Sequence, residues 1–199
     1  MSICKILCYI CRVKHSKVKQ NIIETASALF YRNGYNATGI NEIIAESGIA
    51  KATLYNHFKS KEDICLAYLK HMNATFIKDI KSFCESSPKG EQRVLALFDF
   101  LDNFFLQKDF NGCWCIKTVS EIPKDNVRVR AEIQSQKTNF IALISNLIAD
   151  NLEIKNHKNL NSYARQIYLL YESAVAESHL HQDSWPIKET KNICSQIIA

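Results

Sequence analysis

The chain has 199 residues, of which 47% are hydrophobic and 23% are charged, and it contains only five Gly and three Pro. This length is enough for a sizeable core in one domain or two small ones, and the composition excludes an intrinsically disordered chain. Sparse helix breakers and long stretches of helical periodicity predict an all-α fold.

The excess positive charge lies at the N-terminal end. The net charge is +5, and residues 1–60 hold eight Lys and Arg against three acids, whereas residues 61–199 hold seventeen of each. A phosphate backbone attracts such an end through counterion release, so this distribution favours a nucleic-acid partner. A basic face that is merely solvated is the alternative.

No apolar run approaches the roughly 20 residues that a membrane-spanning helix needs. The apolar start, MSICKILCYICR, is too short for a secretory signal with a cleavage site. The eight cysteines are irregularly spaced. We therefore expect reduced thiols in a cytoplasmic protein.

Apolar periodicity and capping residues predict helices over residues 17–33, 40–46, 50–57, 61–84, 91–107, 113–121, 126–151, 160–181 and about 186–198. Gly34 suits a left-handed cap after the first helix. Thr38 or Gly39 is the expected N-cap of the second helix, and Ser60 that of the fourth. Gly48 permits a positive φ in the turn between the second and third helices.

Residues 18–58 point most directly to a partner. They predict one longer helix and then two short helices joined by the tight turn Glu46-Ser47-Gly48-Ile49, with a polar, hydroxyl-rich, basic helix after the turn. This is the arrangement that places a short helix in the major groove of DNA.

Each position of that last helix has a physical interpretation. The hydroxyls of Thr53 and Tyr55 can donate to a phosphate or a base edge, and Lys51 supplies charge. Asn56 can pair with adenine and Ala52 can touch a thymine methyl. Two further residues of this segment are apolar and are expected to anchor the helix to the first one: Leu54 and Phe58.

The same segment resembles the TetR family of bacterial transcriptional regulators. The match covers about residues 18–65 without a gap and is carried by residues 26–30, Gly34, Thr38, Ile43, Gly48, Ile49, Lys51, Thr53, Leu54, Tyr55, His57, Phe58, Lys61 and Glu62. A weaker match, Gly112-Cys113 followed by Glu121, is similar to one branch of the family's C-terminal domains.

The resemblance implies an N-terminal three-helix DNA-binding domain and a larger helical domain that binds a ligand and dimerises. We therefore expect an N-terminal arm at 1–16, a helix-turn-helix domain at 17–63, and an effector-binding and dimerisation domain at 64–199. The implied DNA-binding residues are Thr38, Lys51, Ala52, Thr53, Tyr55, Asn56, His57 and Lys61.

Within that set, the family comparison assigns Tyr55, His57 and Lys61 mainly to phosphates, and residues 51–53 to the groove face. A structural role for His57 is the alternative. The chain departs from the family pattern at two positions. Ala50 replaces a Ser that would cap the third helix or contact a phosphate, and Ile44 replaces a small Ala between the second and third helices.

Cysteines near the N-terminus are spaced like the ligands of a metal site. Cys4, Cys8 and Cys11 match the spacing of the radical-SAM iron–sulfur motif, and His15 adds a fourth candidate ligand. That enzyme class needs an α/β barrel, which this sequence does not predict. We therefore expect no metal site or other cofactor, and an extended or partly helical arm whose basic residues contact DNA.

Cys113 and Cys115 are the candidate redox sensors, with Lys117 one helical turn away as an aid to Cys113. The alternative is a pair of small buried apolar side chains, and residues two apart on a helix do not favour a disulfide. His179 and His181 are expected to face solvent. The candidate effector-pocket residues are Phe104, Phe105, Cys113, Trp114, Phe140, Tyr168 and Tyr171, set in a wider aromatic group with Phe98.

Hydrolase, Walker and Rossmann motifs are lacking from the sequence, so an enzyme is not expected. The resemblance predicts a homodimeric regulator, most often a repressor, on a palindromic double-stranded operator and controlled by a small-molecule effector. The last two helices would form the dimer interface, with Ala174, Ala176 and Ser178 allowing close approach. The alternative is a redox-sensing or ligand-sequestering helical protein without operator binding.

Overall fold

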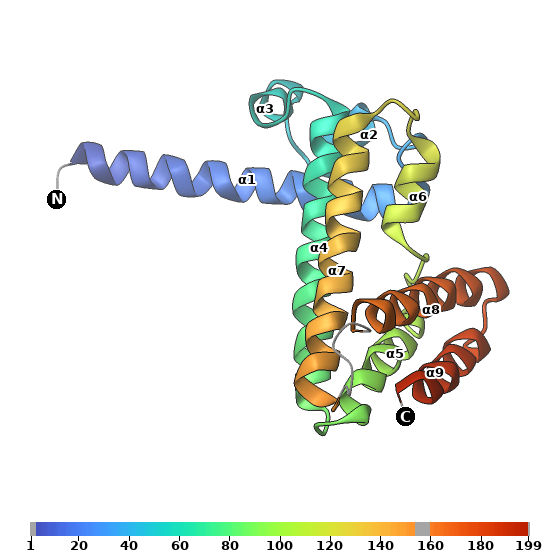
Figure 1. Cartoon of the computed structure of the whole chain (residues 1–199). Coiled ribbons are helices and arrows are strands. Elements are labelled where there is room, and N and C mark those ends of the chain that lie inside the picture. The colour runs from blue at the N-terminus through green and yellow to red at the C-terminus, as the bar shows by residue number, and fades with distance from the viewer. Residues whose placement is uncertain (1–2, 154–159, 199) are drawn as a thin grey trace.

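The computed structural model describes the backbone of residues 3–153 and 160–198, and side chains from residue 17 onward within those ranges. All regular structure in these ranges is helical (Figure 1), which confirms the all-α prediction. The helices are α1 (Ile3–Asn33), α2 (Ile40–Glu46), α3 (Lys51–His57), α4 (Lys61–Ser86), α5 (Glu91–Phe105), α6 (Trp114–Glu121), α7 (Val127–Asn151), α8 (Leu160–His181) and α9 (Trp185–Ile198).

The start of α1 differs from the prediction. The helix begins at Ile3 rather than at residue 17, and its N-terminal part extends away from the rest of the molecule (Figure 1). Between Ile3 and Asn33 there is neither Gly nor Pro, so no residue interrupts the helical backbone. The side chains of residues 1–16, and with them the cysteine-rich motif and the DNA contacts expected there, lie outside the described residues.

The turns carry the backbone conformations that the sequence predicts. Gly34 and Gly48 have φ of 93° and 65°, the left-handed region that glycine tolerates best. Gly39, not Thr38, is the N-cap of α2. The Ser60 hydroxyl accepts a hydrogen bond from the Asp63 backbone N–H at 3.1 Å, so it caps α4 as expected.

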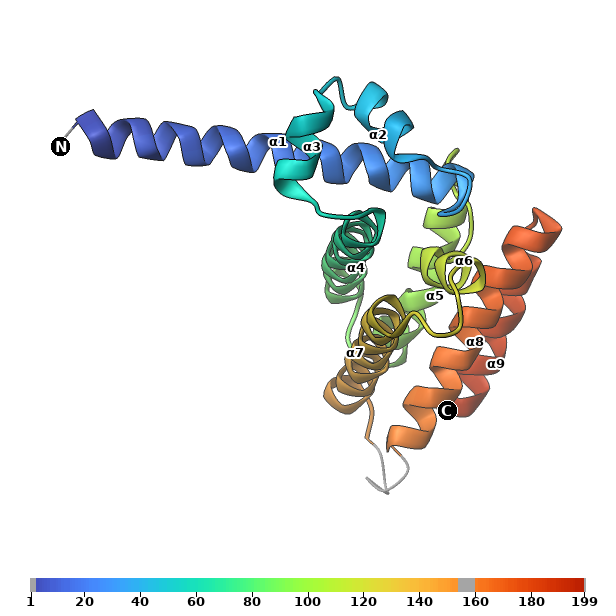
Figure 2. The same cartoon turned by 90° about the horizontal axis from the view of Figure 1, so that it is seen from above.

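Two groups of helices are joined by α4. The first group, α1 to α3, packs around the beginning of α4, and we call it the head. The second group, α5 to α9, packs along the rest of α4, and we call it the body. Helices α4 and α7 lie side by side and run in the same direction, while α8 and α9 lie together on the other side of α5 (Figure 2).

Buried residues form two apolar clusters. One joins α1, α2 and α3 to the first half of α4 and to α6 and α7, and the other fills the body among α4, α5, α7, α8 and α9. Phe76 and Cys113 pack against both clusters. The head is therefore held by the same core that supports α6, and a change at Phe76 or Cys113 affects both clusters.

None of the described helices is both long and apolar enough to cross a bilayer. In the part of the chain whose side chains are described, no cluster of three or more His, Cys, Asp or Glu is arranged to hold a metal ion.

Candidate DNA-binding surface and effector cavity

Helix α3 has one buried face and one exposed face. Leu54 is fully buried and Phe58 is 5% exposed, and both belong to the cluster that contains the core of α1. The groove interpretation requires four exposed residues on this helix, and all four are exposed: Lys51, Ala52, Tyr55 and Asn56. The predicted anchoring of α3 by Leu54 and Phe58 is confirmed, and the opposite face is free for a partner.

Thr38 does not belong to this exposed face. Its side chain is fully buried, and its hydroxyl lies 2.8 Å from the Gly34 carbonyl and 3.3 Å from the Leu29 carbonyl, to which it donates. The hydroxyl therefore secures the end of α1 rather than pointing outward, which corrects its inclusion among the DNA-facing side chains. Thr53 and His57 are half-buried at the edge of the exposed face.

Lys61 is held at the start of α4 by the turn after α1. Its Nζ lies 4.4 Å from the centre of the Tyr35 ring and 3.5 Å from the Asn36 carbonyl oxygen. Partial burial lowers the pKa of Lys61. The Tyr35 ring thus holds the Lys61 ammonium in position beside the head, where it could contact a phosphate.

The departures from the family pattern have visible consequences. Ala50 is the N-cap of α3 and provides no side-chain hydrogen bond there. Ile44 is half-buried against the head cluster. The turn itself is tied to α1, because the Asn21 amide donates to the Ser47 carbonyl at 2.9 Å. Asn21 was not singled out from the sequence, since nothing local links it to a turn 26 residues later.

A hydrogen-bonded joint connects the end of α1 to the loop before α6. The Tyr31 hydroxyl donates to the Gly112 carbonyl at 3.1 Å and accepts from the Asn111 backbone N–H at 2.8 Å. The Asn111 side-chain amide donates to the Tyr31 carbonyl at 2.7 Å and to the Arg32 carbonyl at 3.2 Å. Burial raises the pKa of Tyr31 to about 12, so the hydroxyl keeps its proton and can fill both roles.

Two further residues of α6 contact the head. The Lys117 ammonium donates to the Tyr31 carbonyl at 2.9 Å. The Glu121 carboxylate accepts from the Asn36 backbone N–H at 2.6 Å, while its backbone carbonyl accepts from the Asn36 side chain at 2.9 Å. A Cβ on Gly34 would come within 2.4 Å of the Glu121 carboxylate. The middle and the C-terminal end of α6 are therefore bonded to residues at and just after the end of α1.

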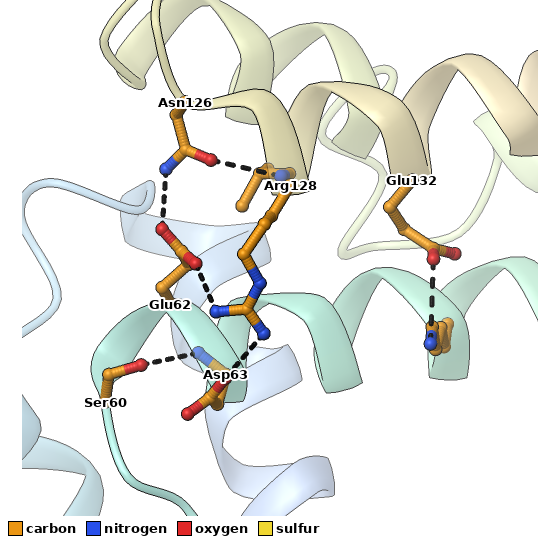
Figure 3. Close-up of polar contacts among 8 residues, drawn as sticks. Ser60, Glu62, Asp63, Asn126, Arg128 and Glu132 are labelled. Atoms are coloured by element: carbon orange, nitrogen blue, oxygen red, sulfur yellow. Dashed lines mark hydrogen bonds and ion pairs between the residues drawn. The ribbon is translucent and has the colours of Figure 1, made fainter.

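A polar cluster fixes the start of α7 to the start of α4 (Figure 3). Arg128 bridges Glu62, at 2.6 Å, and Asp63, at 2.9 Å. Asn126 caps α7 by accepting from a backbone N–H at 3.0 Å, and its amide donates to Glu62 at 3.0 Å. The Arg128 guanidinium, through its hydrogen bond to the carboxylate, is the largest cause of the lowered pKa of Asp63.

The body holds a cavity of about 30 Å³ at the junction of the two apolar clusters. This is about the volume that one water molecule takes up in the liquid, so an organic ligand needs the surrounding side chains to move. Five of the predicted effector residues line it: Phe104, Cys113, Trp114, Phe140 and Tyr171. Phe105 and Tyr168 are not among the lining residues. They pack next to it instead, on Phe110 and Phe140 respectively.

Charged and sulfur groups form one side of this cavity. The Lys137 ammonium lies 3.3 Å from the Cys113 sulfur and 2.6 Å from the Glu172 carboxylate. Burial opposes the charge on Lys137, but the sulfur and the carboxylate outweigh it and raise the pKa of Lys137. A hydrogen bond from Cys115 and the positive charge of Lys137 lower the pKa of Cys113, against the opposing effect of burial.

The structure changes the sequence-based interpretation of these thiols. Lys137, not Lys117, is the lysine beside Cys113. Cys113 is the N-cap that precedes α6, with φ of −83° and ψ of 113°, so it does not share a helix with Cys115. The Cys115 sulfur lies 3.5 Å from the Gln136 side-chain oxygen. Both thiols are free, and the Cys115 thiol favours the thiolate form of Cys113.

Two polar atoms at the cavity wall lack a partner within the described residues. The indole N–H of Trp114 and the hydroxyl of Tyr171 are buried without a hydrogen bond, and these side chains are 8% and 2% exposed. An unpaired buried donor costs about 1–3 kcal/mol, so a native protein usually gives such a group a partner. A ligand with an acceptor atom would supply one.

The two C-terminal histidines are not equivalent. His181 is exposed and pairs with Glu177 at 3.3 Å. The expectation that His179 faces solvent is wrong, because its Nε2 lies 3.0 Å from the Asn111 side-chain oxygen and its ring packs edge-on against Phe110. The Asn111 joint thus reaches from α1 to α8.

The outer face of α8 and α9 carries exposed apolar side chains: Leu169 (64% exposed), Leu180 (71%), Trp185 (48%) and Ile193 (43%). The small residues expected there divide between two faces. Ala176 is exposed, whereas Ala174 and Ser178 are fully buried inside the chain's own core. Of the three, Ala176 alone lies where a second subunit could approach.

Comparison with known proteins agrees with this architecture. Residues 22–68, which hold α2, α3 and the adjoining parts of α1 and α4, match the family model described as "Bacterial regulatory proteins, tetR family". The "Fatty acid metabolism regulator protein" of Bacillus subtilis is 21% identical over 89% of this chain and 91% of its own length. The "HTH-type transcriptional repressor NemR" of Escherichia coli is 22% identical over 94% of this chain and 97% of its own.

Solved structures have the same fold. A TetR-family transcriptional regulator from Streptomyces coelicolor superposes with a TM-score of 0.81 at 23% identity, covering 91% of this chain and 88% of that one. The reduced form of E. coli NemR superposes with a TM-score of 0.80 at 21% identity, covering 92% and 97%. With the exposed α3, the match at residues 22–68 shows that the head is that of a TetR-family transcriptional regulator, and the solved structures show that nearly the whole chain has the fold of that family.

Proposed function

We propose that this chain is a ligand-responsive repressor that binds a palindromic operator as a homodimer in the cytoplasm. The observation that carries the proposal is the division of α3 into a buried face, with Leu54 and Phe58, and an exposed face, with Lys51, Tyr55 and Asn56. The relatives that cover nearly the whole chain are named as regulators, one of them as a repressor. They are not named as enzymes.

The proposed contacts follow from exposure. Lys51, Ala52 and Asn56 would face the groove and Tyr55 would contact a phosphate, while the half-buried Thr53 would reach the groove, and His57 and Lys61 would reach phosphates, from the margins of the surface. The proposed domain division places residues 17–63 on the operator and residues 64–199 around the effector and the partner subunit. That boundary lies in the first turn of α4, so one continuous helix would connect the two.

The DNA proposal is tested by a gel shift with the DNA that flanks the chain's own gene. Specific binding that weakens steeply with salt is expected, and Lys51→Ala should lower the salt slope by about one counterion. Tyr55→Ala should weaken binding as well. Lys78→Ala removes an exposed charge from α4, away from α3, and should leave affinity unchanged. Binding that survives both changes in α3 would refute the groove assignment.

The dimer proposal rests on the exposed apolar face of α8 and α9. Two recognition helices must sit about one helical turn of DNA apart, and a two-fold dimer supplies that spacing. Replacing Leu169 and Leu180 together by Glu should give a monomer in light scattering. Leu106→Glu, at a residue equally exposed but beyond α5, should leave the dimer intact. A dimer that persists with both α8 changes would place the interface elsewhere.

The effector would act through the cavity and the joint next to it. Gly112 and Cys113 line the cavity, and the neighbouring Asn111 and the Gly112 carbonyl are bonded to Tyr31 at the end of α1. A ligand larger than about 30 Å³ displaces this loop, and packed residues of the head cluster transmit the displacement to the head. Allostery of this kind requires that the ligand bind the two head positions with different affinity.

A second function, sensing by a cysteine without operator binding, is favoured by one observation, the contact between Cys113 and Lys137. The gel shift separates the two functions. A protein that responds to thiol reagents but never binds the flanking DNA would support the second.

A further inference from the structure

We propose that Cys113 is a covalent effector site whose thiolate adds to small α,β-unsaturated carbonyl compounds, with Lys137 as the adjacent acid. The expected effect of the adduct on DNA binding rests on the proposed function. The chemistry at the cavity stands on contacts within the body alone.

The arrangement around the sulfur supplies a nucleophile and a proton donor together. Lys137 lies 3.3 Å from the Cys113 sulfur, and its position is held by the Glu172 carboxylate at 2.6 Å. The Lys137 and Glu172 side chains are 19% and 18% exposed, so water screens this pair only weakly. The lowered pKa of Cys113 agrees with this geometry, since an ammonium neighbour favours the thiolate.

The other three described thiols inside helices α4 and α9 lack this setting. Burial raises the pKa of Cys65, Cys84 and Cys194 to about 12, and each is 1% exposed or less. Cys113, in contrast, borders the cavity and lies beside the Lys137 ammonium, so a molecule that enters the cavity meets its sulfur. Reactivity is therefore expected at Cys113 and not at these three.

The chemistry of the cavity selects a conjugated carbonyl compound. Its remaining wall is mostly apolar and includes five aromatic side chains, and the charges of Lys137 and Glu172 neutralise each other, so a neutral and largely apolar molecule is favoured over an ion. A carbonyl oxygen can accept from the ammonium while the conjugated β carbon meets the sulfur. The same oxygen can accept from the unpaired N–H of Trp114 or hydroxyl of Tyr171.

The reaction step balances without a redox partner. The Cys113 thiolate forms a carbon–sulfur bond at the β carbon, and the electron pair of the carbon–carbon double bond moves to give an enolate. The enolate takes a proton from the Lys137 ammonium, which regains one from solvent. The net change is the addition of a thiol across the double bond, and Glu172 keeps its partner once Lys137 is recharged.

The adduct also explains how such a small cavity could signal. A group of four or more carbons exceeds about 30 Å³, so the wall must widen where Phe76 and Cys113 touch both apolar clusters. Cys113 directly follows Gly112, whose carbonyl accepts from Tyr31. Covalent attachment keeps the cavity open for as long as the bond lasts, and operator affinity is expected to fall.

The test uses the reduced full-length protein, methyl vinyl ketone as the probe, and N-acetylcysteine as a reference thiol. Adducts are assigned by mass spectrometry of proteolytic peptides, which separates Cys113 from the N-terminal cysteines. At pH 6 a thiol with a lower pKa than N-acetylcysteine has a larger fraction in the reactive thiolate form. Each tenfold increase in that fraction is reduced about threefold, because a less basic thiolate is a weaker nucleophile. Cys113 should therefore react at least about threefold faster than N-acetylcysteine. Its rate should also fall less steeply than the reference rate between pH 8 and pH 6.

Two lysine variants locate the source of the effect. Lys137→Met should slow the labelling of Cys113 several-fold, whereas Lys117→Met, four residues along the chain from Cys113, should not, because that ammonium contacts the Tyr31 carbonyl. The proposal is overturned if Cys113 in the unchanged protein is labelled no faster than N-acetylcysteine, or if the two rates have the same pH profile. This result counts even if Lys137→Met fails to fold. Equal labelling of two folded lysine variants would overturn it too.

The outcome is separable from that of the proposed function. If the unmodified protein binds DNA but Cys113 shows no preference, the covalent site is wrong and the regulator stands. If Cys113 forms the adduct but no flanking DNA is bound, the covalent site stands and operator binding fails. Where both hold, Cys113→Ser should bind DNA and no longer respond to the probe.

Discussion

Tyr31→Phe is the sharpest perturbation of the joint between head and body. The change keeps the ring, which is 8% exposed, and removes only the hydroxyl. That hydroxyl donates to the Gly112 carbonyl at 3.1 Å and accepts from the Asn111 N–H at 2.8 Å. Two hydrogen bonds at about 1 kcal/mol each predict a loss of about 2 kcal/mol in the free energy of unfolding. For a chain of this size that corresponds to a decrease in Tm of about 4–8 °C.

The assay is thermal unfolding followed by circular dichroism, with hydrogen exchange at the Asn111 amide as a local measurement. The Asn111 N–H loses its acceptor in the variant and should exchange faster than in the unchanged protein. Tyr35→Phe is the matched control, because its ring packs at a tilt against Phe30 and lies under the Lys61 ammonium, while no hydrogen bond to its hydroxyl is found within the described residues. Its Tm should change little.

Equal Tm values for Tyr31→Phe and Tyr35→Phe, with unchanged exchange at Asn111, would refute the reasoning. Such a result would mean that the loop at residues 111–113 is held by its side-chain bonds and by packing, and that the Tyr31 hydroxyl adds nothing. The proposed route from the cavity to the head would then have to run through α4 instead.

Arg128→Gln should make the free energy of unfolding depend less on pH in the acid range. In the parent protein the pKa of Asp63 is lowered, so its carboxylate contributes stability above the ordinary aspartate pKa of about 3.9. This contribution is lost as the pH falls through the lower pKa of the folded state. In denaturant titrations the gap between variant and parent should therefore narrow below about pH 4. Gly34→Ala should destabilise the chain by about 1 kcal/mol or more, because φ is 93° and the new Cβ would lie 2.4 Å from the Glu121 carboxylate. Pairing it with Glu121→Ala should recover only the steric part of the loss, and full recovery in the double variant would show that backbone strain is negligible.

Local patterns determined the helices and the surface of α3. Apolar periodicity predicted most helix ends to within two residues, and Ser60, Gly34 and Gly48 marked caps and turns, because these depend on neighbours in the chain. The start of α1 was missed, since the absence of a helix breaker after Ile3 is a weaker signal than a cap.

Tertiary structure decided which groups meet. Cys113 and its cavity could be suspected from the sequence, but Lys137 lies 24 residues away on α7 and Glu172 on α8, so no local spacing pairs them with the sulfur. The nearer Lys117 turns toward the head instead. Thr38 followed the family pattern for a DNA contact and is buried, because its hydroxyl closes the end of α1. The sequence by itself determined a helical regulator with an exposed recognition helix, while only the packing of distant helices determined the thiol, ammonium and carboxylate that make its cavity reactive.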